Sequence, residues 1–163
     1  MFESGNYSAE DRFFEAFAGD FAKPSWFLGI RQALPKLDLQ GVDAIAEIIY
    51  PDNSTVLVPA EVKGNRDHID AYYRDHPMSF AAKVVIVVVF RRDSFARIRG
   101  DFFHEVERRR LNNIRYEEFF AKLERAEFGA GMRRRVAQVA ANRAAREQYK
   151  EECKRQRTAR AAE

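Results

Sequence analysis

The sequence contains only one cysteine, Cys153, which excludes an internal disulfide and a metal site built from several thiolates. The longest apolar run covers only residues 84–90, whereas a membrane-spanning helix needs roughly 20 apolar residues. The charged amino-terminal segment lacks the apolar stretch of a signal peptide. We therefore expect a cytoplasmic protein that does not contact a membrane.

Two frequent catalytic motifs are also missing. The chain has no glycine-rich phosphate loop and no Gly-x-Ser-x-Gly sequence, so nucleotide-driven and serine-based chemistry have no support. What the chain does have is 163 residues, of which 46% are hydrophobic and 13% aromatic. This is enough for one globular core and too little for two large domains.

Basic residues are concentrated at the carboxyl end. Residues 132–163 hold ten Lys or Arg and four Glu, a local net charge of +6, which leaves 18 basic and 21 acidic groups, or −3, in residues 1–131. Gly129 and Gly131 separate the two parts, so we predict one domain over 1–128 and a basic, Ala/Arg-rich helix over 132–163. Such a helix favours contact with phosphates or an acidic partner, although a solvated helix is the alternative interpretation.

Helical spacing of apolar residues and capping residues predict six helices. Ser8 and Asp11 resemble a capping box, and the phenylalanines that follow predict a helix over 9–18 that Gly19 ends. Pro24 and Ser25 open a second candidate, which Pro35 ends. The remaining candidates are residues 67–76, a helix capped by Asp93 or Ser94, and residues 115–127 and 132–158.

Three segments have the composition of strands. Residues 41–50 and 55–63 flank a turn-rich PDNS sequence and predict a β-hairpin. The uniformly apolar residues 84–90 predict a strand in the middle of a sheet, covered on both faces. The order of these elements indicates an α/β core in which helices flank a short mixed sheet.

The hairpin carries the charges of chemical interest. Glu61 and Lys63 lie two residues apart on one strand and therefore share a face. Pairing across a regular four-residue loop makes partner numbers sum to 105 and turns Asp43 away from Glu61. A three- or five-residue connection, or a bulge at Pro59, makes the sum 104 and sets Asp43 opposite Glu61, with Cβ atoms roughly 5 Å apart. Because proline cannot complete a regular interior ladder, we expect the second arrangement.

Two carboxylates at that separation repel each other unless a cation neutralises them. Oxygen-only ligands suit Mg²⁺ or Mn²⁺ rather than zinc. A bound metal would polarise a phosphodiester and lower the pKa of a bound water, while Lys63 would orient that water or stabilise the developing charge. The pattern thus predicts metal-assisted hydrolysis of a nucleic-acid backbone by Asp43, Glu61 and Lys63.

The segments GVDA and PAEVKG, together with the upstream run WFLGIRQALPKLDLQ, resemble the PD-(D/E)xK nuclease superfamily, in its branch of small bacterial proteins. The resemblance covers roughly residues 8–111 and implies a restriction-endonuclease-like core, α-β-β-β-α-β, with a helical carboxyl-terminal extension. It implies that Asp43, Glu61 and the backbone carbonyl of Val62 bind the metal and that Lys63 is the catalytic lysine. It also implies a further Glu from the first helix, for which we choose Glu15 over Glu10. Only two strands are evident before residue 67, so the third is expected within 34–42 or at the hairpin edge.

These features predict an Mg²⁺- or Mn²⁺-dependent nuclease that acts on DNA. Residues expected to contact nucleic acid are Arg66, Tyr73, Arg133, Arg134 and Arg135. The alternative is a catalytically silent nuclease-like module that binds nucleic acid or assembles with proteins through its basic helix. A homodimer and a subunit of a larger complex both stay open.

Overall fold

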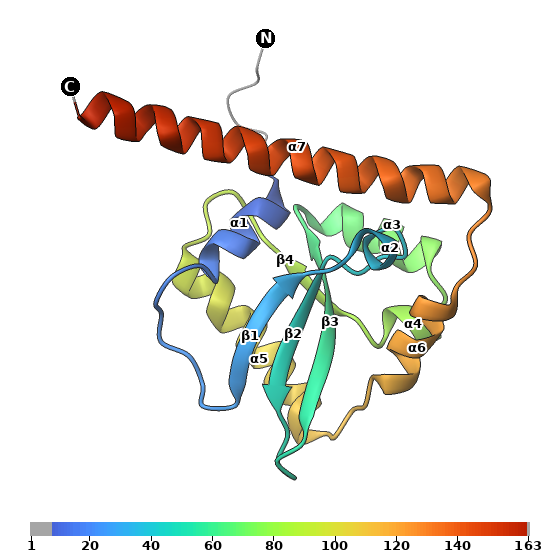
Figure 1. Ribbon diagram of the computed structural model, residues 1–163. Helices are drawn as coiled ribbons and strands as arrows, with labels where there is room; N and C mark the ends of the chain where they lie inside the picture. The colour runs from blue at the N-terminus through green and yellow to red at the C-terminus, as the bar shows by residue number, and fades with distance from the viewer. Residues whose placement is uncertain (1–7, 163) are drawn as a thin grey trace. The chain divides into compact units, whose positions relative to one another are not determined.

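The computed structural model describes residues 8–162, which form an open four-stranded mixed sheet flanked by helices (Figure 1). In chain order the elements are α1 (Ala9–Ala16), β1 (Phe27–Gln32), α2 (Pro35–Asp38), β2 (Ala44–Ile49), β3 (Thr55–Lys63), α3 (Arg66–Asp75), α4 (Met78–Ala81), β4 (Val85–Val88), α5 (Phe95–Leu111), α6 (Glu117–Arg125) and α7 (Ala130–Ala161). The expectation of an α/β fold with a mixed sheet is confirmed.

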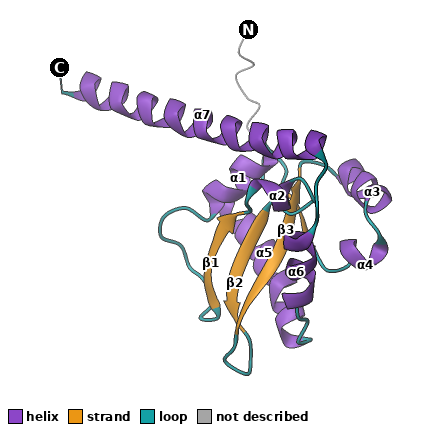
Figure 2. Ribbon diagram, turned by 45° about the vertical axis from the view of Figure 1, so that its right-hand side comes forward, coloured by secondary structure: helices purple, strands orange, loops and turns teal. Residues whose placement is uncertain are grey.

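The sheet has the strand order β1-β2-β3-β4. The pairs β1–β2 and β2–β3 are antiparallel, and β3–β4 is parallel. A parallel pair requires a crossover connection, which α3 and α4 supply between β3 and β4. Figure 2 shows the strands side by side with helices packed around them.

Two sequence-based expectations about the strands are wrong. Residues 27–32, which we expected within a second helix, form β1 and pair with β2. This segment is the third strand before α3. It lies outside residues 34–42, the first of the two expected places, and at the edge of the β2–β3 hairpin, the second. The apolar strand β4 lies at an edge of the sheet rather than in its middle. Val85 and Val87 are buried, whereas Ile86 and Val88 on the other face of β4 are only half-buried, so this strand is not fully covered on both faces.

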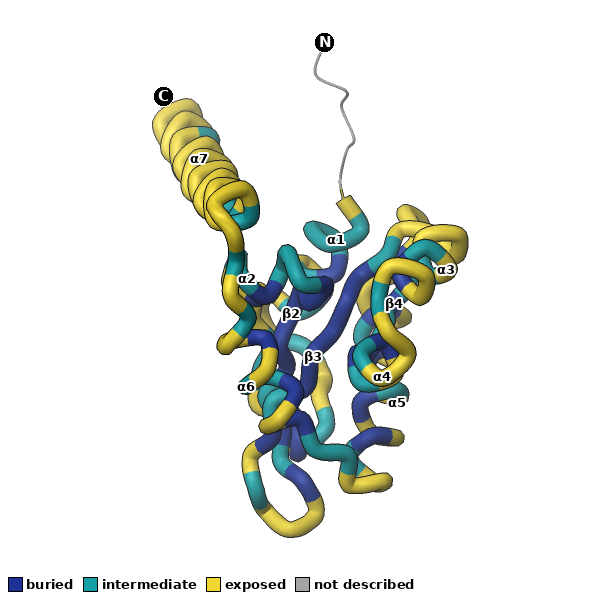
Figure 3. The backbone as a smooth tube through the Cα atoms, turned by 90° about the vertical axis from the view of Figure 1, so that its right-hand side faces the viewer, coloured by how far each residue is buried: buried dark blue, intermediate teal, exposed yellow. Residues whose placement is uncertain are grey.

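The alternation of side chains along β2 separates two apolar clusters. Ala44, Ala46 and Ile48 point into the larger cluster, which α1 and α5 cover with Phe13 and Phe102 among others. Ile45 points to the opposite face, where α2 and α6 contribute Leu37, Phe119 and Leu123. The centre of the sheet is therefore covered on both faces, and Figure 3 shows β2 and β3 mostly in the colour of buried residues.

Local capping fixes the ends of several helices. The Ser8 hydroxyl accepts a hydrogen bond from the Asp11 N–H at 3.1 Å, and Ser94 accepts one from Arg97 at the start of α5. Both predicted caps are thus confirmed. The first helix ends at Ala16, two residues earlier than expected, and a short helix that the sequence pattern did not indicate, α4, precedes β4.

The chain divides into two compact units, one ending at Arg125 and the other beginning at Ala126. The second unit consists largely of α7, a 32-residue helix without a buried residue. Between residues 8 and 162, no helix is both long and apolar enough to cross a membrane.

Candidate metal centre

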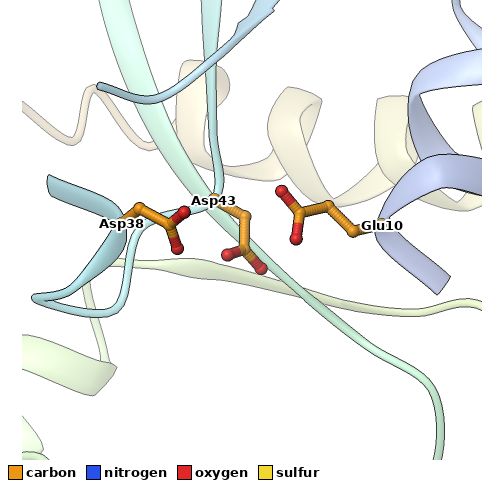
Figure 4. Close-up of side chains that lie close together, drawn as sticks. All are labelled: Glu10, Asp38 and Asp43. Atoms are coloured by element: carbon orange, nitrogen blue, oxygen red, sulfur yellow. The ribbon is translucent and has the colours of Figure 1, made fainter. Parts of the chain in front are cut away.

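Acidic side chains from four elements meet at one end of the sheet. Asp43 immediately precedes β2, and Glu61 lies near the end of the antiparallel neighbour β3, so the two adjoin. Asp38 comes from the last residue of α2, and Glu10 from the first turn of α1. Figure 4 shows the carboxyl groups of Glu10, Asp38 and Asp43 directed toward one another.

The register of the β2–β3 hairpin sets the positions of Asp43 and Glu61. Partner numbers sum to 104, as in Ala44 opposite Ala60, because five residues connect the paired Ile49 and Thr55. The expected bulge at Pro59 does not occur. Pro59 lies opposite Ile45 in regular register, and the ladder with β4 begins only at Ala60, so the missing N–H interrupts no pairing.

Asp43 is held by the backbone on both sides. Its N–H donates to the Ala60 carbonyl at 2.9 Å, and its carbonyl accepts from the Ala33 N–H at 2.9 Å. Its side chain accepts a hydrogen bond at Oδ2 from the Val62 N–H at 2.8 Å. Asp43 itself is only 6% exposed. The carboxyl group thus has a fixed orientation against β3.

Three carboxyl groups form a compact cluster. Glu10, Asp38 and Asp43 each offer one oxygen, and these oxygens all lie within 4.8 Å of one another. The Gln32 amide at the end of β1 donates to Glu10 Oε1 at 3.2 Å and helps to position that side chain. Such a separation places several oxygen donors within reach of one cation.

Glu61 adds a fourth carboxyl group and links it to Lys63. The Lys63 ammonium donates to Glu61 Oε1 at 2.8 Å, and the same ammonium lies 5.2 Å from the centre of the Tyr72 ring. Unless Asp43 carries a proton, Glu61 Oε2 is buried without a hydrogen-bond partner in the described part of the chain. A buried carboxylate oxygen without a donor is costly, and a cation or a proton would remove that cost.

A tight turn before Asp43 is fixed by α3. Gly41 has φ +98°, a left-handed conformation that favours glycine. The buried Tyr72 hydroxyl donates to the Gly41 carbonyl at 2.8 Å. His76 stacks on Tyr72 with ring centroids 4.1 Å apart, so a side chain at position 41 would meet both rings. Tyr72 therefore supports the turn that presents Asp43.

The electrostatics of the cluster favour protonation when no cation is bound. Burial, followed by the charges of Glu61 and Glu10, raises the pKa of Asp43 to about 9. Burial also raises the pKa of Glu61, although Lys63, through its hydrogen bond and its charge, acts in the opposite direction. Near neutral pH these shifts favour retention of a proton by the coupled pair of Asp43 and Glu61 in the absence of a cation.

The donor set fits a hard divalent cation. All the side-chain donors are carboxylate oxygens, which Mg²⁺ and Mn²⁺ accept, and no thiolate or imidazole belongs to the cluster of Glu10, Asp38 and Asp43. A cation would replace the proton on Asp43 and would supply Glu61 Oε2 with a partner. The N–H and C=O of a strand residue face the same side, so the Val62 carbonyl is expected to face Asp43, as its N–H does.

The first-helix glutamate differs from the expectation. We expected Glu15, but its side chain is exposed, whereas Glu10 lies in the carboxyl cluster. Glu10 precedes Phe13, Phe14 and Phe17 by three, four and seven residues, so it lies on the buried side of α1. That spacing is visible in the sequence and would have favoured Glu10. Asp38, which belongs to the upstream run WFLGIRQALPKLDLQ, also lies in the cluster.

The residues expected to contact nucleic acid belong to both compact units. Arg66 is exposed at the start of α3, and Tyr73 is 43% exposed on the same helix, beside Tyr72. Arg133, Arg134 and Arg135 are exposed on α7. The three arginines belong to the second compact unit, whereas Arg66 and Tyr73 belong to the first.

Comparisons with known proteins identify no relative. No protein-family model, curated protein or solved structure matches the chain. The function of the protein is therefore inferred from the chemistry and geometry of its carboxyl cluster.

Proposed function

We propose that this protein is a divalent-metal-dependent nuclease that hydrolyses phosphodiester bonds of DNA. The observation that carries the proposal is the convergence of four carboxyl groups at one end of the sheet, with Lys63 bonded to one of them. A cluster of this kind, largely shielded from water, is expensive to maintain without a cation to neutralise it. The basic helix supplies an independent reason to expect a polyanionic substrate.

In this proposal Asp43, Glu61 and the Val62 carbonyl hold Mg²⁺ or Mn²⁺, and Glu10 takes the role that we expected of Glu15. Asp38 completes the cluster. The cation, when bound, would polarise the scissile phosphate and lower the pKa of an attacking water. Because burial raises the pKa of Asp43, cation binding at this carboxyl group would be accompanied by release of a proton.

Lys63 is positioned to act on the substrate. Its ammonium is fixed between Glu61 Oε1 and the face of the Tyr72 ring, and the side chain remains 23% exposed. An ammonium held in this way can donate to a phosphate oxygen or to the attacking water without a large loss of side-chain entropy on binding. Tyr72 acts on the reaction only through the placement of Lys63 and of the Gly41 turn.

We further propose that the fold is restriction-endonuclease-like. The order of α1, three strands, α3 and β4 corresponds to the α-β-β-β-α-β order of the resemblance, with α2 and α4 as insertions. This support is limited to topology and to the location of Asp43, Glu61 and Lys63. A catalytically silent module that uses α7 is the second candidate, favoured only by the charge of that helix.

Cleavage assays test the proposal. Supercoiled plasmid, linear duplex, single-stranded DNA and RNA would each be incubated with Mg²⁺, Mn²⁺ or EDTA. We expect metal-dependent cleavage of DNA that Glu61→Gln and Lys63→Met each reduce at least a hundredfold, since each removes a group from the reacting centre. Matched controls are Glu15→Gln and Lys23→Met, which change exposed residues of the same types. Metal-independent cleavage, or equal losses in the controls, would contradict the proposal.

A further inference from the structure

The basic residues of α7 are not spread evenly around the helix. Successive residues of an α-helix are rotated by about 100°, so their angular positions follow from the sequence numbers. An arc of about 120° contains seven of the ten basic residues of α7 and none of its three glutamates. These seven, called the basic face below, are Arg135, Arg143, Arg146, Lys150, Lys154, Arg157 and Arg160.

The rest of the helix surface is close to neutral. Arg133, Arg134 and Arg155 lie outside the basic face, and so do Glu147, Glu151 and Glu152. The helix therefore carries a strong charge on one side and little net charge on the other. A helix stabilised only by solvated charges would gain most from Glu and Lys at i and i+4, with both signs mixed around its surface.

We infer that the basic face binds the phosphate backbone of double-stranded nucleic acid, an inference that rests on the proposed function for the identity of the polyanion. From Arg143 to Arg160 a basic residue occurs every three or four positions, over a length of about 26 Å. A DNA duplex of that length carries a phosphate charge about every 1.7 Å of its axis. The continuous row of basic side chains on α7 can thus lie along the continuous row of phosphate charges on the duplex.

The chemistry of the face favours a nucleic acid over a protein or a membrane. Protein interfaces need an apolar centre with aromatic or methionine residues. Met132, Val136 and Val139 lie within this arc near the start of α7, but from Arg143 onward its only other residues are Cys153 and Ala161. Membrane-surface helices need bulky apolar residues opposite their basic face. On α7 the opposite side instead carries alanines, arginines, Glu151 and Glu152, while Glu147 borders the basic face and forms an ion pair with Lys150 at 3.5 Å. Arginine, which predominates on the basic face, binds phosphate oxygens in a bidentate manner.

The chain offers a matched test of face against net charge. The face variant combines Lys150→Gln, Lys154→Gln and Arg157→Gln. The control variant combines Lys23→Gln, Lys122→Gln and Arg125→Gln, which are exposed residues of the first compact unit, so each variant loses three positive charges. Glutamine is nearly as good a helix former as Lys or Arg, so circular dichroism should show the same helix content in both variants.

Binding would be measured by fluorescence anisotropy with a labelled DNA duplex of about 20 base pairs in EDTA, which prevents cleavage, across a range of salt concentrations. Each lost phosphate contact should reduce the salt slope of log K by about 0.9, so the face variant should lose about 2.7 and bind at least about tenfold more weakly at 0.1 M salt. The control variant should change the slope by less than about 1.

Three results would overturn the inference: no binding of duplex by the unmodified protein, equal losses in the two variants, or no loss in the face variant. Addition of Mg²⁺ to the same samples separates this inference from the proposed function. Binding with the expected slopes but without cleavage would support the basic face and contradict the nuclease proposal. Cleavage by the unmodified protein, without a loss of duplex binding in the face variant, would support the nuclease proposal and contradict the inference about the basic face.

Discussion

Replacement of Gly41 with alanine tests how α3 positions Asp43. An alanine at a φ of +98° costs about 1–2 kcal/mol, since the left-handed region disfavours side chains. The new Cβ would also lie 2.6 Å from His76 Nε2 and 3.1 Å from the Tyr72 ring. His76 is stacked between Tyr72 and Phe80, so it cannot yield freely, and crowding of this kind adds about 1–3 kcal/mol.

The expected loss is therefore about 2–5 kcal/mol, or roughly 5–15 °C in melting temperature for a domain of this size. Two other glycines serve as controls. Gly19→Ala has a positive φ of +72° but no atom within 4 Å of the new Cβ, so it should lose only about 1–2 kcal/mol. Gly29→Ala has neither problem and should stay within about 0.5 kcal/mol.

Urea and thermal unfolding of the three variants would measure these differences, and calorimetric titration with Mn²⁺ would show the effect on the site. Gly41→Ala should weaken Mn²⁺ binding at temperatures where the protein is still folded, because Asp43 lies two residues from the turn. Gly19→Ala should not. If Gly41→Ala were no more destabilising than Gly19→Ala, the close packing of α3 on this turn would be refuted.

Three further outcomes follow from the same geometry. Folding raises the pKa of Asp43 to about 9 from about 4 in an unfolded chain, so its stabilising effect is fully present below pH 4 and is lost as pH rises toward 9. The melting temperature of the metal-free protein should fall over that range, more steeply than in Asp43→Asn, and a parallel fall in both would contradict the assignment. Tyr72→Phe removes the hydrogen bond to the Gly41 carbonyl and should cost about 1–3 kcal/mol in urea unfolding, since the buried carbonyl loses its donor; an unchanged midpoint would argue against this contact. Ser94→Ala removes the cap of α5 and should cost about 1 kcal/mol without altering Mn²⁺ affinity, whereas a loss of affinity would show that the cap and the site are coupled.

The hairpin and the placement of its charged residues were predictable because they depend on local rules. Alternation assigns Glu61 and Lys63 to one face, and the loop length sets the register that brings Asp43 beside them. The structural feature that sets this register was predicted less well, because we expected a bulge at Pro59. A five-residue connection sets it without any bulge, because Pro59 lies just outside the ladder with β4.

The segment that forms β1 shows where sequence periodicity fails. Trp26, Phe27 and Ile30 have helical spacing, and prolines on both sides resemble helix boundaries. In the structure the segment pairs with β2, and its residues Phe27 and Trp26 pack with α5 through Phe103. Pairing with a strand about 20 residues away outweighs a weak local preference, and no window of a few residues contains that information.

The full membership of the carboxyl cluster depended on contacts distant in sequence. The presence of Glu10 in the cluster could have been predicted from its position on the apolar side of α1, whereas that of Asp38 could not. Asp38 reaches the cluster because α2 ends there and the turn at Gly41 reverses the chain, with Tyr72 fixing that turn from α3. Each of these steps joins segments that sequence patterns treat separately.

The rate of Mg²⁺-dependent cleavage of supercoiled plasmid by Glu10→Gln and Glu15→Gln tests the central claim most directly. The two substitutions make the same chemical change on one helix, five residues apart, in the cluster and on the exposed surface respectively. We predict that Glu10→Gln lowers the rate of cleavage at least tenfold and that Glu15→Gln leaves this rate unchanged. Equal rates in the two variants, or no cleavage by the unmodified protein with any divalent cation, would contradict it.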